Sequence, residues 1–417
     1  MSKKLHILFL SDFVPSPRSG SATSQLYAYY IEGLRRRGYD VSFVALARAH
    51  ERHLADDLLQ QVTYRQVVPI AQDLFARMGR LVRRVIDPAE YALVHSSGLD
   101  SILLDVMRRQ RFDLIHANHP WLVHAARRAL RRLSNAVRPV LIGQVMDIIT
   151  ALRFQHIYSA PRAVRPLYLL SFARAAYCEF INYSLTDGLI VYNTKDAEVI
   201  KILLPNSNNV FISPAWFDFI EEICDGYRER KGNKILFIGN FNDKRTKEGM
   251  AWFTDRVLPN LLQAINNLEV NLVGVKDKKS EDVFCTKEYI KCYGYQSHSD
   301  FLAFYDSASV LIFPLQFGRY SCHLKVLNAF ARGLPVVMTS WANSGAEAVP
   351  GEEALVADTP EAFAECIIRL LRDPALAARI AEGGLRRIRR EYPSPSVVLD
   401  SLEQAYQTAI TQKEYRR

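Results

Sequence analysis

Basic side chains follow a short apolar segment in the second half of this chain. Lys244, Arg245 and Lys247 come a few residues after the apolar segment 235–238, which Gly239 follows directly. Cations grouped in this way can neutralise a diphosphate through charge-assisted hydrogen bonds. A solvated loop would have the same composition. The pattern therefore leaves two interpretations, an anion-binding loop and an exposed surface loop.

Another cation stands where a loop enters a predicted helix. The loop contains Gly318, Arg319, Tyr320 and Ser321, and the helix begins with Leu324, Lys325 and Val326. A lysine in the first turn opposes the helix macrodipole, so it is not there for helix stability. A bound anion would explain its position. The alternative is a solvated lysine, whose unfavourable interaction with the helix macrodipole is small enough to be tolerated.

Two glycines lie in loops that follow predicted strands. Gly20 precedes a helix, where backbone N–H groups can approach a phosphate. Its loop lacks the G-x-G-x-x-G dinucleotide pattern, and a plain β–α turn would also explain it. Gly294 and Tyr295 follow the segment 290–293 and would flank a planar base, or form a simple turn.

Two histidines and a carboxylate follow apolar segments of the first half. His116 and His119 come after residues 114–115, and Asp147 comes after residues 140–145. A histidine can donate to a sugar hydroxyl or accept its proton. Helix capping and packing are the alternatives for all three residues. No third metal ligand is nearby, so the segment does not indicate a metal site.

These residues need a framework of buried strands that all end at one edge of a sheet. Short apolar runs, typical of strands buried on both faces, recur along the whole chain. In the first half they are 7–10, 41–46, 66–70, 114–117, 140–145, 189–192 and 210–212, and in the second 235–238, 270–273, 290–293, 310–313, 336–338 and 354–356. Helical patterns lie between them, so we predict an α/β fold with two doubly wound parallel sheets.

The strand–helix pattern is interrupted once, in the charged and aperiodic stretch 217–233. We place a hinge there and predict two Rossmann-like domains, 1–217 and 218–395, with a C-terminal helix over 396–417 that crosses back to the first domain. Ligands of doubly wound sheets bind at the carboxyl ends of strands. The site is therefore expected in a cleft that the two domains face.

Composition excludes several classes of protein. The chain has 417 residues, of which 49% are hydrophobic and 23% charged, as in ordinary globular proteins. No apolar run approaches the roughly 20 residues needed to cross a bilayer, and we interpret residues 5–10 as a strand rather than a signal peptide. The six cysteines form no Cys-x-x-Cys pair, so we expect reduced cysteines in a cytoplasmic protein and no structural zinc.

The net charge of +9 is unevenly distributed. Residues 1–217 hold 27 basic and 17 acidic side chains, whereas residues 218–417 hold 26 and 27. No nucleic-acid-binding module accompanies this charge. Arginines cluster at 35–37, 83–84, 108–111 and 127–132, on predicted helices of the first half. Each cluster could be a solvated helix face, and together they suggest attraction to an anionic surface such as the inner face of the cell membrane.

The segment 325–374, which begins KVLNAFARGLPVVMTSW, resembles the donor-domain signature of the glycosyltransferase group 1 family. The family's block reads Lys/Pro-x-x-Glu-Ala-Met-Ala-x-Gly-x-Pro-Val-Val and precedes a Pro-Glu-Ala-Phe-Ala helix. The chain is similar in particular to sugar transferases of bacterial exopolysaccharide clusters. The resemblance is specific in the second half and looser in the first, where residues 113–121 match a stretch that is often His-Ala-His.

The resemblance implies the GT-B fold and a retaining, metal-independent glycosyltransferase without a cofactor. A nucleotide-sugar donor would be held by the second domain, and a glycan, lipid-linked or small-molecule acceptor by the first. Lys325 and one or more of Lys244, Arg245 and Lys247 would hold the diphosphate at the helix start, Leu324–Val326. Gly294 and Tyr295 would flank the base, Asn328 would face the ribose, and His116, His119 and Asp147 would line the acceptor region.

The chain departs from the family at two glutamate positions, which are Tyr320 and Asn328 here. Asn328 can still hydrogen-bond a hydroxyl, but without a negative charge. Two alternatives to a transferase follow. One is a catalytically silent relative that binds a nucleotide sugar or a partner transferase, and the other is a GT-B nucleotide-sugar epimerase.

Overall fold

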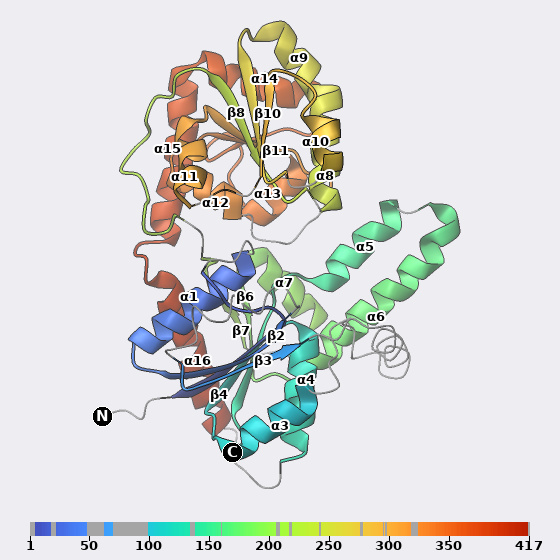
Figure 1. Cartoon of the computed structure of the whole chain (residues 1–417), viewed down its shortest axis with the longest axis vertical. Helices are drawn as coiled ribbons and strands as arrows, with labels where there is room; N and C mark the ends of the chain where they lie inside the picture. Colours follow the sequence, from blue (N-terminus) through green and yellow to red (C-terminus); the bar gives the residue numbers. More distant parts are fainter. Residues whose placement is uncertain are drawn as a thin grey trace. The chain divides into compact units, whose positions relative to one another are not determined.

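The computed structural model divides the chain into two compact units (Figure 1). Unit 1 comprises Met1–Ala215 and Val398–Arg417, and unit 2 comprises Trp216–Val397. The structure describes residues 5–17, 22–47, 62–69, 99–133, 138–159, 161–205, 209–216, 219–241, 243–275, 278–294, 296, 298–317 and 324–415. The division falls close to the expected boundaries at 217 and 395, and the last helix belongs to unit 1.

Unit 1 is built on a seven-stranded parallel sheet in the order β3-β2-β1-β4-β5-β6-β7. Its strands are β1 (His6–Ser11), β2 (Asp40–Ala47), β3 (Tyr64–Pro69), β4 (Leu114–Asn118), β5 (Val140–Gln144), β6 (Gly188–Val191) and β7 (Val210–Ile212). The central strands β4, β5 and β6 are buried along their whole length, as their continuous apolar runs predict.

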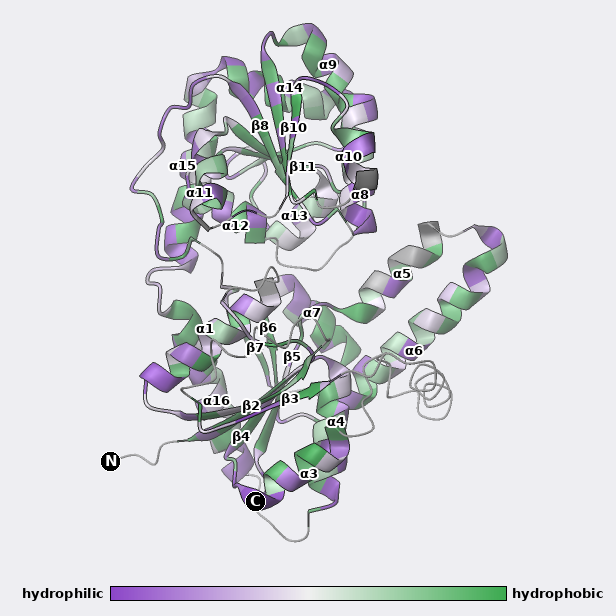
Figure 2. Cartoon of the chain, viewed as in Figure 1, coloured by the Kyte–Doolittle hydropathy of each residue, from purple (hydrophilic) through white to green (hydrophobic). Residues whose placement is uncertain are grey.

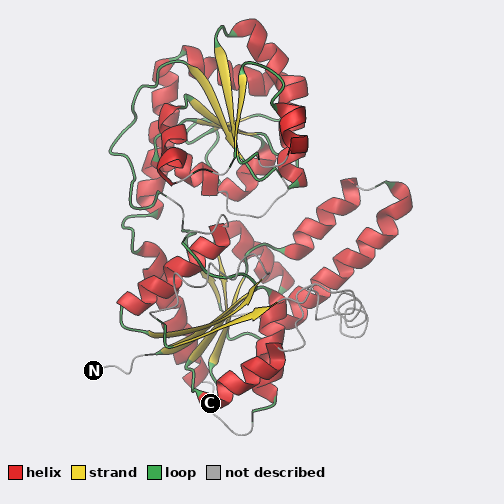
Figure 3. Cartoon of the chain, viewed as in Figure 1, coloured by secondary structure: helices red, strands yellow, loops and turns green. Residues whose placement is uncertain are grey.

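Helices follow the strands of unit 1 and cover its sheet (Figure 3). They are α1 (Ala22–Arg36), α3 (Leu99–Arg109), α4 (Pro120–Arg131), α5 (Ile149–Ser159), the 3-10 helix η2 (Arg162–Val164), α6 (Arg165–Tyr183), α7 (Thr194–Leu203) and α16 (Val397–Tyr415). Helices α5 and α6 pair as a hairpin that projects from the body of unit 1 (Figure 1).

Helix α16 returns to unit 1 and is held there by polar contacts at both of its ends. Near its start, Arg37 forms an ion pair with Asp400 at 2.7 Å. Near its end, the Lys413 ammonium donates to the Asp187 carboxylate at 2.6 Å. The chain therefore closes unit 1 with residues that follow unit 2 in the sequence.

Unit 2 repeats the design with a six-stranded parallel sheet in the order β10-β9-β8-β11-β12-β13. The strands are β8 (Asn233–Ile238), β9 (Leu268–Val273), β10 (Ile290–Tyr293), β11 (Val310–Phe313), β12 (Val336–Met338) and β13 (Leu355–Val356). The helices are α8 (Lys244–Trp252), the π-helix η3 (Phe253–Val257), α9 (Leu258–Ala264), α10 (Lys278–Phe284), α11 (His298–Ser307), α12 (Leu324–Ala331), α13 (Ser340–Ala346), α14 (Pro360–Arg372) and α15 (Pro374–Glu391).

The helical segment after β8 has three parts, α8, η3 and α9. It begins at Lys244, because the Asp243 carboxylate accepts from the Arg245 backbone N–H and caps the helix start. A π-helical turn then interrupts it just before Pro259. Proline has no N–H to donate, so the regular ladder cannot continue through that position. Lys244, Arg245 and Lys247 therefore lie in a helical turn and not in a loop.

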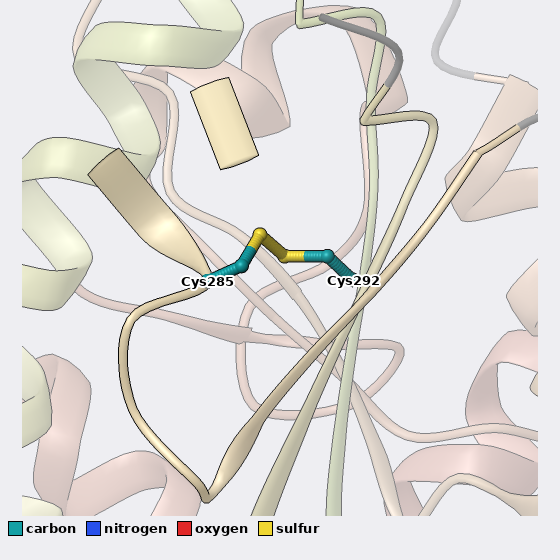
Figure 4. The surroundings of a disulfide bond; sticks show 2 residues. All are labelled: Cys285 and Cys292. Carbon is teal, nitrogen blue, oxygen red and sulfur yellow. A yellow bond between two sulfur atoms is a disulfide. The ribbon is translucent and has the colours of Figure 1, made fainter. Parts of the chain in front are cut away.

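The prediction that all six cysteines are reduced is wrong for Cys285 and Cys292. They form a disulfide that joins the end of α10 to β10 (Figure 4), with their Cα atoms 5.9 Å apart. The sequence could not show this, because the turn that folds the two segments together leaves no Cys-x-x-Cys pattern. Among the described residues, Cys178, Cys224 and Cys366 take part in no disulfide.

Candidate functional site

The strand order of each unit places one pair of strands at the point where the winding reverses. In unit 1 the reversal lies between β1 and β4, and in unit 2 it lies between β8 and β11. Ligands of open α/β sheets bind beside the carboxyl ends of the two strands at this point. The candidate residues after β4, β8 and β11 thus belong to the reversal points of their units.

In unit 2 the carboxyl end of β8 is shaped by two glycines. Gly274 has a φ of +101°, and a Cβ there would lie 2.1 Å from the Gly239 carbonyl oxygen. A Cβ on Gly239 would itself lie 2.7 Å from Thr246. At Gly274 the obstacle is backbone and the φ is positive, so only glycine fits there. At Gly239 the obstacles are the side chains of Thr246 and Phe237, which pack directly against the turn that follows β8.

The first turn of α8 carries a fixed guanidinium. The Arg245 side chain donates through Nε to the Asp243 carboxylate at 2.9 Å, and its Nη2 lies 2.8 Å from the same oxygen. Burial alone would raise the pKa of Asp243, but the hydrogen bonds and charge of Arg245, with the charge of Lys325, hold it below its ordinary value. Asp243 was not predicted as a site residue. Its place directly before a run of basic residues is the signal that could have identified it as a helix cap.

Lys325 lies in the first turn of α12, as predicted, and is partly buried. Its ammonium nitrogen is 5.6 Å from the centroid of the Phe313 ring at the end of β11. Burial lowers the pKa of Lys325 to about 8. The positive charge of Arg245 also lowers this pKa, whereas the negative charge of Asp243 raises it. A desolvated ammonium near a guanidinium, with one carboxylate close by, is an arrangement that an anion would stabilise.

The other predicted donor residues lie on α8 or α12, follow β10, or fall outside the described residues. Lys244 is exposed and pairs with Glu248 at 3.2 Å, and Gly294 follows β10, where an added Cβ would lie 3.6 Å from the Val275 carbonyl oxygen. Asn328 is buried in α12 with 1% of its surface exposed. Lys247, Leu324 and Val326 lie on the same helices as Arg245 and Lys325. Gly20, Tyr295, Gly318, Arg319, Tyr320 and Ser321 lie outside the described residues.

In unit 1 the ends of β1 and β4 bring together Asp12, Asn118 and His119. The Asn118 amide donates to the Asp12 carboxylate at 3.0 Å, and His119 Nε2 lies 3.7 Å from the same oxygen. The His119 ring stacks on Trp121 with a 4.4 Å separation of ring centroids. His119 has a φ of 64°, a conformation that is costly for a residue with a side chain and is found most often at functional sites.

Three polar atoms of this cluster are buried and have no hydrogen-bond partner among the described residues. They are Asn118 Oδ1, His119 Nδ1 and Trp121 Nε1. Buried polar groups are nearly always paired in native proteins. The cluster is therefore suited to bind a ligand with several hydroxyl groups, which can both donate and accept. Asp12 and Asn118 were not predicted as site residues, although both follow predicted strands.

His116 lies inside the core of unit 1 and not on a pocket wall as expected. Its side chain is fully buried, and its ring nitrogens contact the Tyr406 hydroxyl at 2.6 Å and the Gln144 side chain at 2.7 Å. Burial lowers the pKa of His116 to about 3, so the ring is neutral at physiological pH. The side chain has no exposed surface that could meet an acceptor. Its contacts instead fix α16 against β4.

Asp147 is partly buried between β5 and α5. Close to it, the buried Glu179 accepts from the backbone N–H groups of Ile149 and Thr150, at 2.7 and 2.9 Å, and so caps α5. Burial raises the pKa of Glu179 to about 7, and the charge of Asp147 adds to the rise. The carboxylate that organises this part of unit 1 is Glu179, which sits in a helix with no distinguishing sequence pattern.

Two doubly wound units of this kind define the GT-B class. The chain has a TM-score of 0.67 with sucrose-phosphate synthase from Thermosynechococcus elongatus, at 14% identity over 98% of this chain and 100% of that one. It has a TM-score of 0.64 with HepE from Anabaena, solved in complex with UDP, at 12% identity over 97% and 99% of the two chains. At these identities the likeness establishes the fold.

The sequence comparison gives a family match over part of the chain. Residues 232–373 match the family described as Glycosyl transferases group 1. It is also 27% identical over 121 residues to the capsular polysaccharide biosynthesis glycosyltransferase CapM of Staphylococcus aureus, a match covering 28% of this chain and 30% of CapM. The matched segments span less than half of the length of the curated relatives. The expected fold is confirmed, and the expected family resemblance is found over residues 232–373.

Proposed function

We propose that the protein is a glycosyltransferase that moves a sugar from a nucleotide-diphosphate sugar to a glycan, lipid-linked or natural-product acceptor. The observation that carries the proposal is the cation pair of Arg245 and Lys325 at the reversal point of unit 2. It lies inside the segment that matches the group 1 family. The pair provides two charges to the donor diphosphate, and the starts of α8 and α12 provide backbone N–H groups.

The proposed chemistry proceeds with retention and needs no metal ion. The cation pair stabilises the charge that develops on the leaving diphosphate, and a leaving phosphate oxygen takes the acceptor proton. In unit 1, His119 and Asn118 orient the acceptor hydroxyl. His116 takes no direct part, because its ring is buried and engaged. Asn328 remains our proposed ribose contact and Gly294 our proposed base contact.

The relatives guide the choice of substrates. HepE was solved with UDP, which supports UDP-sugars as the first donors to test. CapM is named for capsular polysaccharide biosynthesis, which supports a polysaccharide acceptor. No helix in the part of the chain that the structure describes is long and apolar enough to cross a membrane. We propose a cytoplasmic protein that associates with the inner face of the cell membrane.

Transfer and hydrolysis assays with UDP-, GDP- and dTDP-sugars test the proposal. Lys325→Ala should reduce turnover about tenfold or more, because it removes a charge-assisted contact of about 1.5–3 kcal/mol. Lys291→Ala is the control, because Lys291 is an exposed cation of unit 2 paired with Glu269 at 2.7 Å. Unchanged turnover in Lys325→Ala would refute the assigned role.

Three product measurements separate the proposal from its alternatives. Anomeric coupling constants of the product should show the configuration of the donor. Tight donor binding without turnover of any sugar would indicate a silent relative. Sugar epimerisation in the absence of an acceptor would indicate an epimerase.

A further inference from the structure

The α5–α6 hairpin of unit 1 carries apolar side chains that face solvent. The exposed fractions are 69% for Leu167, 61% for Leu170 and 52% for Leu169. The exposed fractions of Phe154, Tyr177 and Phe180 are 46%, 47% and 49%. Figure 2 shows hydrophobic residues along much of α6, on a hairpin that projects from the body of the unit. Isolated exposed apolar residues are ordinary, but a group of this size on one element marks an interaction surface.

The same hairpin is cationic. Residues 149–183 contain the four arginines Arg153, Arg162, Arg165 and Arg174, and Glu179 is the sole acidic residue of that segment. Glu179 is buried at the hairpin base, where it accepts from the Ile149 backbone N–H of α5. Apolar side chains mixed with arginine are typical of helices that lie in an anionic lipid surface.

A cavity of about 380 Å³ opens at the base of the hairpin. Its lining is nearly all apolar and includes Ala176, Ile200, Leu203 and Leu204 from α6, α7 and the residue that follows α7. Tyr177 and Phe180 also line it, and both are about half exposed, so the cavity is continuous with the apolar face of the hairpin. The volume falls in the range of small-molecule sites.

The Tyr183 hydroxyl is a polar group of the lining that lacks a partner among the described residues. Tyr183 is 1% exposed, and its hydroxyl makes no hydrogen bond with any described residue. A buried hydroxyl donor of this kind needs an acceptor atom from a ligand or a water molecule. An ester carbonyl at the head of an acyl chain is such an acceptor, and it is uncharged, which suits a position close to the Glu179 carboxyl group.

We propose that this cavity binds the acyl chain of an anionic membrane lipid, and that the exposed face of α5 and α6 lies in the membrane that supplies it. The apolar lining accommodates the chain, Tyr183 donates to the ester oxygen, and the arginines meet the anionic headgroups. The lipid binding does not depend on glycosyl transfer. Only the further step, that the site holds the lipid of a lipid-linked acceptor, rests on the proposed function.

Two measurements on the intact chain, both without a donor, test the site. The first is co-sedimentation with vesicles of phosphatidylcholine, with and without phosphatidylglycerol. We expect binding to the anionic vesicles and loss of that binding in Leu167→Ser/Leu170→Ser. Val283→Ser is the matched control, since Val283 is 60% exposed in unit 2. Equal recovery of the double variant and wild type would overturn the membrane face.

The second measurement is calorimetric titration with monooleoyl phosphatidylglycerol below its micelle-forming concentration. Ala176→Phe fills the cavity and should abolish binding, and Tyr183→Phe should weaken it about 3- to 10-fold by removing one hydrogen bond. Binding that neither variant changes would overturn the cavity assignment. Sedimentation analysis covers one more outcome, because a dimer that Leu167→Ser/Leu170→Ser dissociates, with no vesicle binding, would assign the face to a second copy of the chain.

Activity on a water-soluble acceptor keeps the two proposals separate. The hairpin and cavity variants should retain it, because none of them changes the cation pair of unit 2. If no sugar is transferred but lipid binding follows the pattern above, the proposed function fails and the lipid site stands. If transfer is intact and vesicles are not bound, the lipid site and the membrane association fail, and the transferase assignment stands.

Discussion

Raising the pH above about 8 should weaken the binding of a nucleotide diphosphate to this protein. Lys325 supplies one of the two charges of the cation pair, and burial lowers its pKa to about 8. The ammonium is charged below that pH and becomes neutral as the pH rises through it. Arg245 keeps its charge throughout, because a guanidinium does not titrate in this range. One of the two anion contacts is therefore lost on the alkaline side.

The size of the effect follows from that single contact. A hydrogen bond to a charged group contributes about 1.5–3 kcal/mol, which corresponds to about a 10- to 150-fold change in affinity. A bound diphosphate stabilises the charged lysine, so the midpoint in the complex lies above that of the free protein. The dissociation constant should be flat between about pH 6.5 and 7.5 and rise about tenfold per pH unit above the free-protein pKa until the contact is lost.

Calorimetric titration of UDP or GDP across this range provides the assay, with three variants for comparison. Lys325→Arg should keep its affinity at high pH, because arginine stays charged. Lys325→Ala should bind weakly at every pH and show no alkaline loss. Lys291→Ala, an exposed cation of the same unit, should follow the wild type. An alkaline loss that persists in Lys325→Ala would refute the reasoning, since another group would then be titrating.

Three further predictions concern stability. Tyr406→Phe leaves a buried ring nitrogen of His116 without its 2.6 Å partner and should cost about 1–3 kcal/mol in urea unfolding, and no measurable cost would contradict the assigned network. Glu179 has its pKa raised to about 7, so the folded state holds a proton that the unfolded state has lost, and stability should fall by up to about 3 kcal/mol as the pH rises from about 4.5 to 7. Glu179→Gln should remove that fall in thermal unfolding measured across the range. Gly274→Ala places a Cβ 2.1 Å from the Gly239 carbonyl oxygen at a positive φ, and it should destabilise unit 2 by about 3 kcal/mol or prevent its folding, as judged by soluble yield and circular dichroism.

The parallel sheets could be predicted because their signal is local. A strand buried on both faces must be apolar along its length, and β4, β5 and β11 show this directly in their sequences. Lys325 could also be identified locally, because a cation in a first helical turn violates a simple electrostatic preference. Both inferences use only residues adjacent in the chain.

The remaining features depend on which segments fold together. Phe9, Gln144 and Tyr406 are distant from His116 in the sequence, yet they surround it and turn a candidate site residue into a core residue. The Cys285–Cys292 disulfide depends in the same way on a turn. The α5–α6 hairpin could not be predicted for a different reason. Its apolar side chains are exposed as well as buried. The sequence therefore lacks the apolar stripe along one side that marks a helix packed on a core.

The charge distribution acquires a physical interpretation from these contacts. The donor site that we propose lies in the half of the chain whose basic and acidic side chains nearly balance, so its affinity for an anion cannot come from an excess of charge. It comes from desolvation, because a partly buried ammonium whose pKa has fallen to about 8 gains more from an anion than an exposed one does. The basic excess of the first half then has to serve a different partner. The arginines of the α5–α6 hairpin lie among exposed leucines rather than around a pocket for a small anion, and a surface that is at once apolar and negatively charged matches both properties, as a membrane of anionic lipids does.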